Sequence, residues 1–140
     1  MAIRELRELA RGVHPAILED EGLGPAVAAL ARRAAIPVEV RASLDDRLAP
    51  LVESTAYFTI AEALTNTQRH ARATHATVLV AGTRMALELE IADDGQGGAD
   101  PTRGSGLRGL QDRVTAVGAT FDVDSPVGAG TRIRATIPTG

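Results

Sequence analysis

The sequence contains neither cysteine nor lysine. Without cysteine the chain forms no disulfide, offers no thiolate nucleophile and cannot ligate zinc through sulfur. Without lysine it has no P-loop, no strand lysine of a eukaryotic-type protein kinase and no Schiff-base chemistry. All 15 basic residues are arginines, so these three classes of site are excluded.

Aromatic residues and net charge are also scarce. The aromatic residues are Tyr57, Phe58 and Phe121, and the net charge is −3. This composition suits neither base stacking nor a basic footprint, so we expect no nucleic-acid partner. No apolar run approaches the ~18 residues that span a bilayer, and no signal peptide is visible. We therefore expect a cytoplasmic domain that makes no membrane contact.

The 140 residues suit one domain, and their periodicity predicts its elements. Four segments have apolar residues at helical spacing, namely residues 3–13, 22–35, 51–72 and 107–117. Five segments are typical of strands, namely residues 37–42, 76–81, 85–91, 120–124 and 131–137. These elements predict an α+β fold, a two-layer sandwich of helices on a mixed, mostly antiparallel sheet.

The long helix expected over residues 51–72 has an unusual polar face. It holds Asn66, the one asparagine in the sequence, although asparagine is a mediocre helix former. Glu62 lies four residues earlier, and Arg69 and His70 follow, so these side chains share one face opposite an apolar stripe. A solvated face is the plainer interpretation. An amide oxygen, a carboxylate and a guanidinium together also suit magnesium and phosphate.

Two glycine-rich segments follow the strand at 85–91. IADDGQGG, residues 91–98, has more carboxylates and glycines than a tight turn requires. Its glycines would let the backbone approach a ligand, and an inward carboxylate could accept from an exocyclic amine. GSGLRGL, residues 104–110, matches G-x-G-x-x-G. We reject a Rossmann site, because residues 93–103 separate its glycines from the strand and the flanking strands are expected to be antiparallel, although the segment could still bind phosphate.

The remaining patterns are weaker. GAGT, residues 128–131, is a turn that places Thr131 at the start of a strand. The histidines form no H-E-x-x-H motif, and G-x-S-x-G is absent, so neither a histidine metal site nor a serine hydrolase is expected.

In order and spacing, the four polar segments resemble the ATP-binding catalytic domain of bacterial sensor histidine kinases, within the GHKL superfamily. EALTNTQRHA resembles the N box, DDGQG the G1 box, GSGLRGL the G2 box, and GAGTRIRATIP the G3 box with its closing strand. The resemblance covers nearly the whole chain. It implies the Bergerat ATP-binding fold, with ATP and Mg²⁺ as ligands.

By position, the resemblance implies a role for each motif residue. Asn66 resembles the magnesium ligand, Glu62 the N-box acid and Arg69 a phosphate contact, with His70 beside it. Asp93 resembles the carboxylate that reads the adenine amine. The resemblance also implies that Gly95 and Gly97 line the base and that Thr131 is the threonine near adenine. The lid that holds the phosphates would include Gly104, Ser105, Gly106, Leu107 and Gly109.

The short gap between the glycine boxes and the lead-in at residues 6–30 resemble the subfamily of nitrate-responsive and lipid-fluidity sensors. This resemblance implies that residues 1–14 are the remnant of a dimerisation helix and that residues 15–140 form the catalytic domain. The family's upstream phosphoacceptor motif is not present, and His14 lies at the end of the lead-in helix. We therefore expect phosphate transfer to a separate dimerisation domain, in a homodimeric parent that serves a response regulator and can be membrane-anchored.

Two other functions fit the same motifs. An anti-sigma-factor-type serine kinase has a similar size, although it would not need a dimerisation-helix remnant. An ATP-dependent conformational switch would gate a partner without phosphotransfer. The general base also stays open, because in this subfamily an acidic residue beside the acceptor histidine, rather than Glu62, is thought to act as base.

Overall fold

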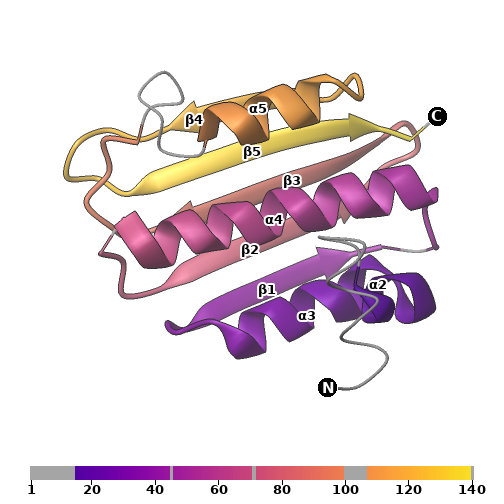
Figure 1. Cartoon of the computed structure of the whole chain (residues 1–140), viewed down its shortest axis with the longest axis horizontal. Coiled ribbons are helices and arrows are strands. Elements are labelled where there is room, and N and C mark those ends of the chain that lie inside the picture. The colour runs from indigo at the N-terminus through magenta and orange to yellow at the C-terminus, as the bar shows by residue number, and fades with distance from the viewer. Residues whose placement is uncertain (1–14, 45, 71, 100–106, 140) are drawn as a thin grey trace.

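The computed structural model describes residues 15–44, 46–70, 72–99 and 107–139 (Figure 1). They form a five-stranded sheet with helices on one face, and so make two layers. The helices are α2 (Ala16–Glu21), α3 (Leu23–Arg33), α4 (Pro50–His70) and α5 (Leu107–Thr115). The strands are β1 (Val38–Ser43), β2 (Ala76–Gly82), β3 (Ala86–Asp93), β4 (Thr120–Asp124) and β5 (Thr131–Pro138).

The strands lie in the order β1-β2-β3-β5-β4. β1 and β2 are parallel, and the other neighbouring pairs are antiparallel. This mixed, mostly antiparallel sheet under helices confirms the predicted α+β sandwich. The expected orientation of the strands around the second glycine segment was wrong. β3 and β4 run in the same direction, because β5 lies between them and is antiparallel to both.

The core lies between the helices and the inner face of the sheet. On β3, Leu87, Leu89 and Ile91 are buried, while Glu88 and Glu90 point to the other face, as their alternation predicts. α4 crosses the middle of the sheet (Figure 1). Its fully or nearly fully buried residues toward the sheet include Ala56, Ile60, Ala63, Leu64 and Thr67. Burying one large aliphatic side chain of this kind stabilises the fold by about 1.5–3 kcal/mol, so this stripe fixes the rotation of α4 about its axis.

Two helices begin the described chain where the sequence predicted one. α2 has six residues, and Gly22 follows it with a φ of +98°, a value that suits glycine and turns the chain into α3. Six residues are too few to show an apolar period, so α2 was missed. α3 begins at Leu23 with Pro25 in its first turn, close to the predicted start. Residues 3–13, predicted to be helical, lie outside the described residues.

Arg47 joins α2 to the start of α4. Its Nε and Nη2 donate to the two carboxylate oxygens of Glu53 at 3.0 and 2.9 Å. Nη2 also donates to the carbonyls of Leu18 and Glu19 in α2. Glu53 is 4% exposed, and its hydrogen bond raises the pKa of the Arg47 guanidinium. Because both oxygens of this buried carboxylate are paired, Glu53 serves the fold.

Candidate functional site

The polar face predicted on α4 exists. Glu62 and Asn66 lie one turn apart and are half-buried, and Arg69 is exposed near the end of the helix. Among the described residues, these three side chains make no hydrogen bond or ion pair. His70 is the last residue of α4, and its side chain lies outside the described part of the structure. The structure therefore presents an amide and a carboxylate, both free to bind a ligand, on one side of the helix.

Asp93 ends β3 beside α4. Its Oδ2 accepts a hydrogen bond from the hydroxyl of Thr67 at 3.0 Å, and its Oδ1 accepts one from the backbone N–H of Gly95 at 2.8 Å. Thr67 belongs to α4 and Gly95 to the glycine loop, so the carboxylate is oriented from two different segments. The sequence did not single out Thr67, because it sits among apolar residues in the buried stripe; only its position next to Asn66 could have drawn attention to it.

Thr131 lies directly opposite Asp93. The two residues are register partners at the adjoining ends of β5 and β3. The Thr131 hydroxyl shares a hydrogen bond of 2.7 Å with the hydroxyl of Ser125, which also accepts the backbone N–H of Ala99 at 2.9 Å. The structure thus brings together Asp93 and Thr131, predicted from separate motifs. Ser125 was missed, because the pattern around it indicated only a turn.

The first glycine loop interlocks with the turn between β4 and β5. Gly97 has a φ of +68°, and a Cβ there would overlap the carbonyl oxygen of Pro126. Gly130 has a φ of +78°, and a Cβ there would overlap the carbonyl oxygen of Asp93. The backbone N–H of Gly128 donates to the carbonyl of Gln96 at 2.6 Å. Gly97 and Gly130 are therefore required by the close approach of backbone to backbone, whatever ligand the loop meets.

Asp94, the second aspartate of the loop, has a different role from Asp93. Its carboxylate accepts hydrogen bonds from the Thr74 hydroxyl and from the backbone N–H groups of Thr74 and His75, and it pairs with His75 Nδ1 at 3.0 Å. The Thr74 hydroxyl, then the backbone N–H groups of His75 and Thr74, hold the pKa of Asp94 well below its usual range. Asp94 therefore ties the end of β3 to the link between α4 and β2.

The second glycine segment is described only in part. Gly104, Ser105 and Gly106 lie outside the described residues. Leu107 is the buried first residue of α5, whereas Gly109 is exposed within the first turn, where an added Cβ would meet open space. Further along α5, the Arg113 guanidinium lies 4.0 Å from the centre of the Phe58 ring on α4. This contact and the buried apolar face fix α5 against α4.

Known proteins align with nearly the whole chain. The sensor protein VraS of Staphylococcus saprophyticus is 30% identical over 140 residues, which cover 96% of this chain and 40% of the relative. The sensor histidine kinase LiaS of Bacillus subtilis is 29% identical over 143 residues, which cover 98% of this chain and 40% of the relative. The chain belongs to the sensor histidine kinase family. It spans about 40% of the length of these two kinases.

Solved structures agree with this assignment. A blue-light activated histidine kinase of Erythrobacter litoralis, EL346, superposes with a TM-score of 0.70 at 27% identity, over 84% of this chain and 41% of that protein. The ATP-binding domain of PrrB from Mycobacterium tuberculosis has the same fold, with a TM-score of 0.67 at 20% identity, over 84% of this chain and 91% of that domain. The chain therefore corresponds to the catalytic domain of the kinases. No protein-family model matches the sequence.

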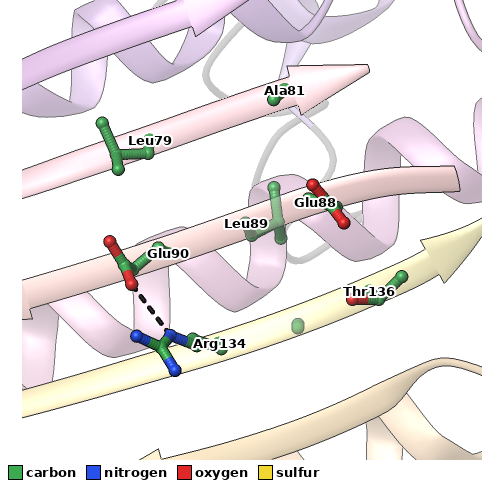
Figure 2. A pocket seen from close by; sticks show the side chains of 8 residues that line it. Leu79, Ala81, Glu88, Leu89, Glu90, Arg134 and Thr136 are labelled. Carbon is green, nitrogen blue, oxygen red and sulfur yellow. Dashed lines mark hydrogen bonds and ion pairs between the residues drawn. The ribbon is translucent and has the colours of Figure 1, made fainter. Parts of the chain in front are cut away.

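The open face of the kinase domain's sheet has a hollow of its own. Figure 2 shows this hollow, of about 330 Å³, whose lining includes Leu79, Glu88, Glu90 and Arg134, with Glu90 paired to Arg134 at 2.9 Å. These side chains point away from α4, so the hollow is separate from the cluster around Asp93.

Across the described residues, no group of three or more acidic or histidine side chains is arranged to hold a metal, and no helix is long and apolar enough to cross a membrane.

Proposed function

We propose that this domain binds ATP with Mg²⁺ and donates the γ-phosphate to a histidine on a separate dimerisation domain of its parent kinase. The main observation behind the proposal is the hydrogen bonding of the Asp93 carboxylate. Each of its oxygens accepts one hydrogen bond from the protein. A carboxylate has about four acceptor positions, so each oxygen can accept one more donor. The exocyclic amine of adenine is such a donor, and Thr131, the register partner of Asp93, would lie beside the same base.

The unpaired face of α4 suits the phosphates. Magnesium prefers oxygen ligands and is usually held by one or two protein groups together with phosphate oxygens and water. The half-buried amide of Asn66, without a partner among the described residues, fits such a site as a single ligand. Magnesium bound there would neutralise charge on the phosphates. Arg69 would contact a phosphate oxygen, and Glu62 is a candidate for polarising the acceptor.

The glycine segments complete the proposed site. Gly95 and Gly97 would line the base, since Gly95 already orients Asp93 through its backbone. The lid over the phosphates would be formed by Gly104, Ser105, Gly106, Leu107 and Gly109. We also propose the partners expected for such a kinase: its own upstream phosphoacceptor domain, a second copy of the parent chain and a response regulator, all on the cytoplasmic side.

Nucleotide selectivity tests the binding half of this proposal. Calorimetric titration should show that ATP binds at least about tenfold more tightly than GTP, because guanine would place a carbonyl against the Asp93 carboxylate. Asp93→Asn should lose this preference. Asp94→Asn is the matched control, because Asp94 is committed to Thr74 and His75 and should not change the ratio. Equal affinities for ATP and GTP would exclude the role of Asp93.

Phosphoryl transfer tests the other half. The chain incubated with labelled ATP and Mg²⁺ should acquire no acid-labile phosphate, because in-line transfer needs an acceptor held opposite the γ-phosphate. Adding a histidine-bearing dimerisation domain should give labelling of that domain, which Asn66→Ala abolishes. ATP binding without any labelling would favour the conformational switch, and labelling of His14, His70 or His75 in the chain alone would contradict a separate acceptor.

A further inference from the structure

Thr67 is the one α4 threonine, among the described residues, whose hydroxyl bonds outside the helix. It is 4% exposed, and its Oγ1 lies 3.1 Å from the carbonyl oxygen of Ala63 and 3.0 Å from Asp93 Oδ2. A hydroxyl has a single hydrogen, so these two acceptors compete for it. Because hydrogen bonds to ionised acceptors are the stronger ones, the hydrogen is drawn to the carboxylate.

The other buried threonines of α4 form hydrogen bonds within their own helix. Thr55 and Thr59 each donate to the carbonyl one turn earlier at 2.7 Å. Such a bond within the helix satisfies a buried hydroxyl and involves no other segment. Thr67 has the longer bond to its own helix and a second acceptor on β3. The Thr67 hydroxyl therefore does more than satisfy its own hydrogen bond within the helix, because it also binds Asp93.

We propose that Thr67 is a specificity-determining positioning residue, whose hydroxyl fixes the plane of the Asp93 carboxylate for recognition of a 6-amino purine. The proposal rests on the ATP binding proposed above. The terminal torsion of aspartate is broad, so one donor alone leaves the carboxylate free to rotate. The N–H of Gly95 holds one oxygen, and the hydroxyl of Thr67 holds the other. With both donors in place, the remaining lone pairs point in fixed directions, which an incoming amine can meet without reordering the site.

The test compares three ligands: ATP, GTP and the triphosphate of purine riboside, which lacks the 6-amine. In the unmodified protein, ATP should bind about tenfold more tightly than the purine-riboside nucleotide, since a hydrogen bond to a charged group is lost without the amine. Thr67→Val, which keeps the shape and removes the hydroxyl, should reduce this ratio to about threefold or less while changing the binding of the amine-free nucleotide little.

Two variants separate positioning from packing. Thr67→Ser returns the hydroxyl and should restore the ratio. Thr59→Val removes an equally buried hydroxyl from the same helix, away from Asp93, and should leave the ratio as it is in the unmodified protein. If thermal melting shows that Thr67→Val does not fold, Thr67→Ala is measured in its place, since alanine is the better helix former.

The possible results distinguish the proposed role of Thr67 from the proposed binding of ATP. Failure of the unmodified protein to bind ATP would overturn both. Tight, amine-dependent binding of ATP that Thr67→Val and Thr67→Ala retain in full would overturn the role of Thr67 and leave ATP binding intact. An equal loss of affinity for ATP and the amine-free nucleotide would show that Thr67 supports only the fold, and would also overturn the role proposed for it.

Discussion

The two ends of α4 carry similar side chains in opposite states. Near its N-terminal end, Glu53 is buried and both of its oxygens are paired with Arg47. Toward its C-terminal end, Glu62 and Asn66 are half-buried, and within the described part of the chain neither makes a hydrogen bond or ion pair. A glutamate and an arginine occur at each end, so charge alone does not distinguish them.

The difference lies in whether each polar group has a protein partner. A polar group that is partly removed from water without a hydrogen bond costs free energy. At the Glu53 end, Arg47 offsets that cost within the fold. At the Asn66 end the polar atoms have no protein partner among the described residues and stay accessible to solvent, so a ligand can bind them by replacing water. The pairing of side chains therefore separates a structural carboxylate from a binding face on the same helix.

Removing Arg47 should have the largest effect. Arg47→Ala leaves Glu53 buried without its partner and should lower the free energy of unfolding by about 2–3 kcal/mol, measured by urea denaturation. Arg41→Ala is the control, because Arg41 and its partner Glu39 are 73% and 58% exposed, so the change should stay within about 0.5 kcal/mol. A loss of stability no larger than that of Arg41→Ala would mean that the Arg47 cluster contributes little.

Changing Asn66 should weaken the effect of Mg²⁺ on ATP binding without destabilising the fold. Asn66→Ala should remove at least about tenfold, or 1.4 kcal/mol, of the gain in ATP affinity that Mg²⁺ provides, because the amide oxygen is lost. Thermal stability should not fall, since alanine is the better helix former. Arg47→Ala, assayed well below its melting temperature, should keep the magnesium effect. A large drop in melting temperature with an unchanged magnesium effect would make Asn66 a structural residue.

Acid should reveal the smaller contribution of Asp94. Folding lowers the pKa of this carboxyl, so its stabilising effect is present above the ordinary aspartate pKa of about 3.9 and is lost as the pH falls below that value toward the folded-state pKa. Asp94→Ala should therefore melt at a lower temperature than the unmodified protein at pH 6. The gap should narrow steadily as the pH is lowered from about 4. A gap that stays constant down to acid pH would contradict an ionised Asp94 in the folded protein.

Periodicity predicted most of the fold. The alternation on β3 and the long apolar stripe of α4 are strong local patterns, and together they led to the α+β sandwich. The direction of β4 relative to β3 was predicted wrongly, because nothing local says that β5 inserts between them. α2 was missed because six residues are too short for a period.

The candidate site was predicted as separate motifs, and its internal contacts were not. The sequence pointed to Asp93 and Thr131 but not to their pairing, which depends on strand register. Thr67 and Ser125 were missed, because a buried threonine and a turn serine are common and acquire meaning only when their partners are known. Gly97 was interpreted as a contact for a ligand, whereas the neighbouring backbone already requires a glycine there, as it does at Gly130. The roles of residues 104–106 stay predictions.

The place of β5 in the sheet bears on how the domain is made. The ribosome delivers β3 and β4 first, yet each of them needs β5 as its neighbour. Until that strand emerges, one edge of β3 and both edges of β4 lack a partner strand, and such edges are prone to pair with other chains. The same strand brings Thr131 to Asp93. A polypeptide truncated before Thr131 would therefore lack both the strand that joins β3 to β4 and the register partner of Asp93, and its unpaired strand edges would stay exposed.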